Sequence, residues 1–159
     1  TKEHLLTFLG AFFGIGIIGF INSKYFILND NLFLIGSFGA SSVLVYGVIN
    51  SPLAQPRNLI GGHIISAFIG VTVCMFLPNE TWLAAALSVS LSIVAMQITK
   101  TLHPPGGATA LIAVIGSEKI RALGYFYVIN PVLIGVLILF LVAMFFNNIT
   151  KHRKYPAAK

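Results

Sequence analysis

The chain has 159 residues, of which 57% are hydrophobic and only 9% are charged, and its formal net charge is +6. A soluble domain carries roughly 25% charged residues, so this composition excludes a water-soluble globular protein and indicates a single membrane-embedded domain, residues 1–159. The basic residues lie at the ends of apolar segments, which is typical of membrane topology and not of nucleic-acid binding. A single cysteine excludes an internal disulfide and gives no indication of a metal cluster.

Six apolar segments follow one another along the chain. They cover approximately residues 5–21, 32–49, 59–77, 82–98, 107–115 and 125–146. At ~1.5 Å per residue, the first, third, fourth and sixth can cross a ~30 Å hydrocarbon core, the second can cross if it is regular, and the fifth is too short. The sequence therefore predicts an all-helical membrane bundle of about six segments. Four full spans with two short or re-entrant segments are the alternative.

Three local signals refine the early segments. Gly10 and Gly14 form a small-xxx-small pair, which predicts close backbone contact with another helix. Residues 29–31, Asn-Asp-Asn, predict a turn. Thr81 is a candidate N-cap for the fourth segment.

Two further features concern the second half of the chain. Ser88 and Ser92 lie on one stripe of the fourth segment, where hydroxyls either line a polar path or bond to the carbonyl one turn back; the second arrangement is the commoner one. Residues 118–127 begin with charged side chains and end with Tyr125 and Tyr127, which predicts an interfacial stretch anchored by both rings.

A weak internal repeat relates the two halves. Residues 39–44, Gly-Ala-Ser-Ser-Val-Leu, resemble residues 107–112, Gly-Ala-Thr-Ala-Leu-Ile. If residues 1–78 and 79–150 are two three-segment units, an odd number of crossings per unit makes them an inverted repeat, with a site at the repeat interface. Chance similarity between glycine-rich apolar sequences is the competing explanation.

The distribution of basic residues predicts a topology. If all six segments cross, seven basic residues fall on one side and three on the other. The seven are Lys2, Arg57, Lys100, Lys151, Arg153, Lys154 and Lys159, and the three are Lys24, Lys119 and Arg121. This asymmetry predicts cytoplasmic N- and C-termini, with residues 151–159 as a basic tail. If the second and fifth segments only dip into the membrane, the split is even. We expect an integral protein of a bacterial plasma membrane.

The most informative stretch is residues 101–116, which contains His103-Pro-Pro-Gly-Gly-Ala-Thr109. The two prolines remove backbone donors and disfavour helix before them. We expect a helix to begin at about Gly107, with small residues leaving its first N–H groups open to an anion. The structural alternative is a Pro-Gly loop between two spans.

Enzyme motifs are absent from the sequence, and all four acidic residues lie at segment ends or in loops. We therefore expect no enzymatic activity and no cofactor. The polar residues near segment starts are mostly donors or cations, which suits an anion that sheds its water. The candidate anion-binding residues are Gly39, Ala40, Ser41, Ser42, Arg57, His63, Lys100, His103, Gly106, Gly107, Ala108 and Thr109. Each has a structural alternative, as a topology charge, a helix cap or an interhelical donor.

These motifs carry a family resemblance. The His103-Pro-Pro-Gly-Gly-Ala-Thr-Ala-Leu stretch resembles the signature of the HPP family of small integral membrane proteins, and residues 51–63 are similar to a second well-kept stretch of that family. The resemblance covers nearly the whole chain. It implies a four-spanning protein, and some members of the family are implicated in nitrite transport in bacteria and plastids.

Two function classes follow. The first is a transporter or channel for a small inorganic anion, nitrite above all, held between two facing helix starts at residues 39–41 and 107–109. The second is a non-transporting structural or assembly subunit. A transporter predicts a polar cavity near Ser41 and Thr109, whereas a packing role predicts their complete occlusion. Because six short segments have little room to enclose a pore, we also expect a homo-oligomer in the lipid bilayer.

Overall fold

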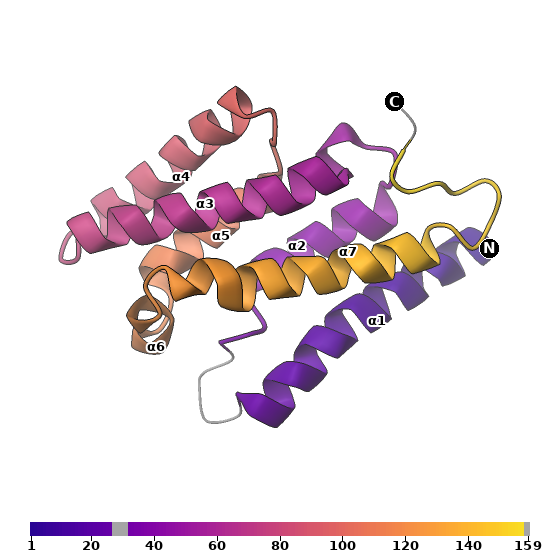
Figure 1. Ribbon diagram of the computed structural model, residues 1–159, viewed down its shortest axis with the longest axis horizontal. Coiled ribbons are helices and arrows are strands. Elements are labelled where there is room, and N and C mark those ends of the chain that lie inside the picture. The colour runs from indigo at the N-terminus through magenta and orange to yellow at the C-terminus, as the bar shows by residue number, and fades with distance from the viewer. Residues whose placement is uncertain (27–31, 158–159) are drawn as a thin grey trace.

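The computed structural model describes residues 1–26 and 32–157, and all regular structure in this part is helical (Figure 1). The turn predicted at residues 29–31 lies outside the described residues. The elements are α1 (Lys2–Tyr25), α2 (Gly36–Ser42), the π-helix η1 (Val43–Gly47), the 3-10 turn η2 (Pro52–Ala54), α3 (Pro56–Phe76), α4 (Thr81–Ile98), α5 (Pro104–Ile115), α6 (Glu118–Ala122), the π-helical stretch η3 (Val128–Leu133) and α7 (Ile134–Phe146). The predicted all-helical membrane bundle is confirmed.

Four helices are long and apolar enough to cross a membrane. They are α1, α3, α4 and the continuous stretch Val128–Phe146 formed by η3 and α7, with 24, 21, 18 and 19 residues. The other two apolar segments form short helices. The twelve residues of α5 span only ~18 Å at 1.5 Å per residue, so neither short helix crosses a ~30 Å core unaided.

The short helices nevertheless carry the chain from one end of the bundle to the other. In Figure 1, α1 and α3 both run away from the end where the two termini lie, and α4 and α7 both run toward it. The chain therefore returns through α2 and η1 between the first pair, and through α5 between the second pair. The six-segment order and the four-span alternative describe the same molecule, in which two passages combine a short helix with non-helical residues.

Helix packing joins the first half of the chain to the second. α1 packs against α7, and α4 packs against α3, while α5 lies against both α3 and α4 and also contacts α2. The contact between α3 and α5 is at backbone distance, because a Cβ at Gly70 would lie 2.5 Å from the carbonyl oxygen of Ala110. A Cβ at Gly62 would likewise lie 2.5 Å from the Cβ of His103. These glycines let α5 press into the surface of α3.

The glycine pair of α1 meets an aromatic ring. Gly10 and Gly14 leave space for Tyr46 of η1, whose hydroxyl donates to the carbonyl of Leu139 at 3.0 Å. Tyr46 is buried and thereby links α1, η1 and α7. The glycine pair does make a close contact, but the predicted contact with the backbone of another helix is wrong, because the partner is the Tyr46 side chain.

Two local predictions need correction, and a third is confirmed. Thr81 is the first residue of α4 and not its cap, because the N-cap is Glu80, which makes no side-chain capping bond. Tyr127 is fully buried, so of the two predicted anchors only Tyr125, 44% exposed, remains at the surface. The hydroxyls of Ser88 and Ser92 bond to carbonyls within α4, as the packing interpretation predicts.

The C-terminal residues are not a free basic tail. Arg153 is buried, and its guanidinium donates to the carbonyl of Tyr46 and to Asn147 Oδ1, at 3.0 and 2.7 Å. The hydroxyl of Tyr155 donates to the carbonyl of Ala54 at 2.7 Å. Burial raises the pKa of Tyr155, so this phenol stays a neutral donor. The prediction overlooked these contacts because it treated every basic residue of the tail as a topology charge.

Candidate functional site

Four polar side chains meet in the interior of the bundle, between the two short helices and α3. They are Ser41 of α2, His63 of α3, and His103 and Thr109 at the start and in the second turn of α5, and each has no exposed surface. We call these four residues the His–Ser–Thr cluster. Residues far apart in the sequence are brought together here because α5 packs against both α2 and α3.

The cluster is connected by short hydrogen bonds. Ser41 Oγ lies 2.7 Å from His63 Nε2 and 2.9 Å from His103 Nε2. On the other side of the His63 ring, Nδ1 lies 2.7 Å from Thr109 Oγ1. The two imidazole rings are tilted against one another, with centroids 5.0 Å apart. The four side chains thus form one continuous chain of polar atoms.

Further hydrogen bonds connect His103 and Thr109, at the two ends of the cluster, to surrounding groups. His103 Nδ1 lies 2.8 Å from the carbonyl oxygen of Leu53, in η2. Thr109 Oγ1 lies 2.9 Å from Ser37 Oγ and 3.3 Å from the carbonyl oxygen of Pro105. The hydroxyl of Tyr127 donates to the carbonyl of Thr109 at 3.1 Å.

The predicted start of the fifth helix is wrong by three residues. α5 begins at Pro104 with His103 as its N-cap, so the N–H groups of residues 107–109 lie inside the helix. The two prolines have no N–H, and the N–H of Gly106 donates to the carbonyl of His103 at 2.8 Å. The N-terminal part of α5 therefore contributes the imidazole of its N-cap His103 and the hydroxyl of Thr109 in its second turn, and not open backbone donors.

The second segment shows the same displacement. α2 begins at Gly36, so residues 39–41 lie beyond its first residues and are not a helix start, and of these three only Ser41 contacts the start of α5, through His103. Gly39 and Ala40 are exposed on the face opposite Ser41. Ser42 is buried, but its hydroxyl donates to the carbonyl of Phe38 in its own helix. Of the four candidates in α2, only Ser41 belongs to the cluster.

The small residues of α5 also divide between two faces. Gly106 is buried, and a Cβ there would lie 2.7 Å from Ser66 Oγ, so it serves packing against α3. Gly107 and Ala108 line an apolar pocket of about 530 Å³ together with Val89 and Leu111. This pocket lies away from the polar cluster, so neither residue contacts a polar group of the site.

The two cationic candidates lie outside the cluster. Arg57 Nη2 donates to the carbonyl of Thr99 at 2.7 Å, at the C-terminal end of α4, where a cation complements the helix dipole. Lys100 is exposed and adopts a left-handed backbone with φ of 56°, which ends α4. Both residues fit their structural alternatives.

Sequence reasoning missed Ser37 and Tyr127 as parts of the site. Ser37 precedes Ser41 by four residues, which is the spacing that places two side chains on one helix face. That signal was present in the sequence. The contact of Tyr127 with Thr109 had no comparable signal, because it depends on how the chain folds back after α6.

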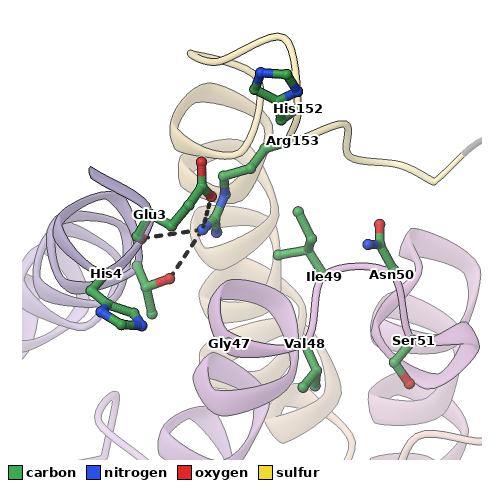
Figure 2. Close-up of a pocket in the computed structure, with 10 residues that line it drawn as sticks. Glu3, His4, Gly47, Val48, Ile49, Asn50, Ser51, His152 and Arg153 are labelled. Atoms are coloured by element: carbon green, nitrogen blue, oxygen red, sulfur yellow. Dashed lines mark hydrogen bonds and ion pairs between the residues drawn. The ribbon is translucent and has the colours of Figure 1, made fainter. Parts of the chain in front are cut away.

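A second polar region opens where the termini lie (Figure 2). A pocket of about 500 Å³ is lined by Glu3, His4, Thr7, residues 47–51, His152 and Arg153. Arg153 Nη1 donates to Glu3 Oε2 at 3.2 Å and to Thr7 Oγ1 at 3.1 Å. The pocket ends two residues before Leu53, whose carbonyl bonds to His103 of the cluster.

The carboxylates that the structure describes lie away from the cluster, at helix ends. Glu3 is in the first turn of α1, Glu80 caps α4, and Glu118 begins α6. Within the described residues, no group of three His, Cys, Asp or Glu side chains is arranged to hold a metal ion. The cluster therefore offers neutral donors and acceptors and two imidazoles, without a fixed negative charge.

The family model described as HPP, transmembrane region, matches residues 1–156. The chain belongs to the HPP family. Two proteins of Dictyostelium discoideum, both named only as transmembrane proteins, are 46% and 47% identical to this HPP protein over 153 residues. The matches cover 94% of the chain but 49% and 53% of those relatives, so it spans about half of their length. No solved structure matches.

Proposed function

We propose that this HPP protein transports a small inorganic anion, with nitrite as the first candidate because of the family resemblance. The observation that carries the proposal is the His–Ser–Thr cluster, in which two imidazoles and two hydroxyls meet in the interior of a four-span bundle. Buried polar groups inside a membrane protein are costly and commonly mark a transport path. Hydroxyl and imidazole donors replace the water of an anion without a carboxylate to repel it.

Ser41 and Thr109 are fully buried, so the polar cavity expected of a transporter is not open at these two residues, and we propose that the structure represents an occluded state. A transporter passes through a conformation in which its central site is closed to both sides, and repeat-based transporters reach it by moving one bundle against the other. We propose that α2 and α5 separate at Ser41 and Thr109 to admit the anion. The polar pocket at the termini, with His4, His152 and Arg153 on its wall, would be the entrance from that side.

The arrangement of helices supports an inverted repeat as part of this proposal. Each half has the order long helix, short helix, long helix. The seven residues of α2 and five of η1 correspond to the twelve of α5, which places Ser41 opposite Thr109 in the alignment of the two similar sequences. Both hydroxyls bond to the same residue, His63, through different ring nitrogens.

The same occlusion favours a second candidate function. Ser41 and Thr109 have no exposed surface, and this is the outcome expected of a subunit in which these residues only pack. In that case the cluster fixes the two short helices to α3, and the protein assembles with a partner in the membrane, either a second copy or another chain. Transport assays decide between the two candidates.

The deciding experiment is uptake into liposomes that contain the purified protein, with nitrite, nitrate, formate and chloride as alternative solutes. We expect nitrite uptake above that of protein-free liposomes, and we expect His103→Asn to reduce it at least tenfold. Ser92→Ala is the matched control, because Ser92 is equally buried but bonds only within α4. Uptake no faster than in protein-free liposomes for every solute would overturn the proposal and favour the structural subunit.

A further inference from the structure

The hydrogen count at Ser41 determines which groups of the cluster must donate and which must accept. A hydroxyl has one hydrogen, yet Ser41 Oγ lies within hydrogen-bond distance of two imidazole nitrogens, His63 Nε2 and His103 Nε2. Ser41 can donate to only one of them. The other imidazole must therefore carry a hydrogen on Nε2 and donate it to Ser41.

The carbonyl of Leu53, which bonds to His103, fixes the positions of the hydrogens in the neutral cluster. The carbonyl of Leu53 can only accept, so His103 Nδ1 carries a hydrogen, and a neutral His103 must accept at Nε2. Ser41 then donates to His103, and His63 donates to Ser41 from Nε2. His63 Nδ1 is left as an acceptor for the hydroxyl of Thr109. In the neutral cluster the two histidines are therefore opposite tautomers.

One added proton is accommodated without moving any heavy atom. If His103 is protonated, its Nε2–H donates to Ser41, Ser41 donates to His63 Nε2, and His63 Nδ1–H donates to Thr109. The hydroxyl of Thr109 then donates to the carbonyl of Pro105 or to Ser37. Transfer of one hydrogen from His103 to Ser41, and of the Ser41 hydrogen to His63, moves the charge to the second ring with every bond retained.

A second proton does not fit. With both Nε2 atoms protonated, two cations would face each other with ring centroids 5.0 Å apart, and the hydrogen of Ser41 would have neither nitrogen as an acceptor. The other groups around the pair do not titrate in the ordinary pH range, and described carboxylates lie at the helix ends. The groups around the pair are Ser37 and the Phe38 ring of α2, Ser66 of α3, Met96 of α4, Thr109 of α5 and the Tyr127 hydroxyl. Arg57 lies outside the cluster and donates to the carbonyl of Thr99.

From this geometry we infer that the cluster carries one proton across with each anion, so that the HPP protein is an electroneutral proton–anion symporter. The inference rests on the proposed function. The neutral cluster accepts the proton at His63 Nδ1, and relay through Ser41 shares the charge with His103, so the occluded site carries a single positive charge that balances a monovalent anion. When the anion is released, the charge returns to His63 and the proton leaves from the same nitrogen, which restores the neutral tautomers.

The tautomers test the relay without any transport measurement. Protein labelled with ¹⁵N at its four histidines, in lipid, reports the state of each ring nitrogen by NMR, with His63→Gln and His103→Gln variants for assignment. We expect His63 as the Nε2–H form and His103 as the Nδ1–H form at high pH, and one proton taken up by the pair as the pH falls. The same tautomer at both histidines, two protons bound, or none bound, would overturn the relay.

Transport in liposomes tests the coupling. Because nitrous acid itself crosses lipid, initial rates are compared above those of protein-free liposomes. For an electroneutral symporter, the accumulation of nitrite rises by up to about tenfold for each pH unit by which the outside is more acidic, and a membrane potential does not change it. For a nitrite uniporter, the accumulation rises by up to about fiftyfold with a potential of 100 mV, and the pH gradient does not change it.

We expect wild-type uptake to follow the pH gradient, Ser41→Ala to lose that response, and the control Ser92→Ala to keep it. Nitrite uptake that follows the potential and ignores the pH gradient overturns the coupling but leaves the proposed function standing. Absence of protein-dependent uptake overturns the proposed function and the coupling together, while the tautomers still establish whether the relay exists.

Discussion

Thr109 connects several of the buried polar groups of the cluster. Its hydroxyl contacts His63 Nδ1, Ser37 Oγ and the carbonyl of Pro105, and its own carbonyl accepts from Tyr127. Thr109 thus joins α2, α3 and α5 through one side chain. Buried polar groups that lose a partner incur their full desolvation cost, so the effect of removing this hydroxyl reaches beyond a single bond.

Thr109→Val retains the shape of the side chain and removes the hydroxyl, so we expect it to lower the free energy of unfolding by about 1–3 kcal/mol. His63 Nδ1 and Ser37 lose their partner in the same step. Thermal unfolding in mild detergent measures the effect, beside nitrite uptake, which should fall as well. Thr72→Val is the matched control, because its hydroxyl bonds to Phe68 of its own helix and to the partly exposed Tyr125. Equal melting temperatures for the two variants would contradict the role given to Thr109.

At the residue scale, the sequence predicted which side chains form the site better than it predicted their geometry. Ser41, His63, His103 and Thr109 were all candidates and do meet, because polar groups inside apolar segments must find one another. Other predicted anion-binding residues, among them Gly39, Arg57, Lys100 and Gly107, lie outside this cluster. Which face of a short helix is buried depends on its starting residue, and the Pro-Pro step moved that start by three positions.

At the element scale, glycine contacts fix the positions of the short helices. A Cβ at Gly70 would lie 2.5 Å from the Ala110 carbonyl and 2.8 Å from its Cα, both of them backbone atoms that cannot turn aside. By contrast, a Cβ at Gly16 of α1 meets nothing within 4 Å. The two glycines look alike in the sequence, since both lie in apolar helices, and only the packing separates them.

We therefore expect opposite results from the same substitution at two helices. Gly70→Ala should destabilise the protein by about 1–3 kcal/mol, because overpacking forces α3 and α5 apart. Gly16→Ala should be neutral or stabilise by up to about 1 kcal/mol, the difference in helix propensity. Melting temperatures of the two variants in the same detergent provide the comparison. A Gly70→Ala protein as stable as Gly16→Ala would mean that α3 and α5 are less closely packed than described.

The limits of sequence prediction at this scale have a physical cause. The four long helices were found because length and hydropathy determine whether a segment spans a bilayer. The break within residues 32–49 into α2 and η1 was not located, because a π-helical turn depends on tertiary contacts such as those of Tyr46 and leaves no periodic signal.

At the scale of the whole molecule, Arg153 fastens the two ends of the chain together. Its guanidinium donates to Glu3 and Thr7 of α1, to the carbonyl of Tyr46 and to Asn147. The side chain of Glu3 is about half exposed, so the ion pair itself is screened by solvent and adds little. The buried bonds to Tyr46 and Asn147 are the stabilising part.

Arg153→Ala should lower the free energy of unfolding by about 2 kcal/mol, because the Tyr46 carbonyl and Asn147 lose charged donors inside the protein. Lys151→Ala and Lys154→Ala remove the same charge from exposed neighbours and should change it by less than about 0.5 kcal/mol. Thermal unfolding of the three variants makes the comparison at matched net charge. Equal losses in all three would show that the segment contributes through its charge alone.

The orientation of the molecule in the membrane follows from the two unequal ends of the bundle. Both termini lie at one end, where α3 begins and α4 ends, whereas α1 ends and α6 lies at the other (Figure 1). Arg57 is the second residue of α3 and Lys100 follows the end of α4, while Lys24 is in the last turn of α1 and Lys119 and Arg121 are in α6. Because loops rich in lysine and arginine stay in the cytoplasm, we expect the end with the termini to be cytoplasmic.

Single cysteines test this orientation, with Cys74 first replaced by alanine. Lys2→Cys and Lys151→Cys lie at the end of the termini, and Asn79→Cys, in the exposed turn between α3 and α4, lies at the other. In intact cells, a thiol reagent that cannot cross lipid should label Asn79→Cys at once and the other two only after permeabilisation. Labelling of Lys2→Cys and Lys151→Cys from opposite sides would contradict the fold, since an even number of passages keeps both ends together. Labelling of both from outside would leave the fold intact and reverse the orientation, so the positive charges at that end would have another cause, such as the anion entrance beside Arg153.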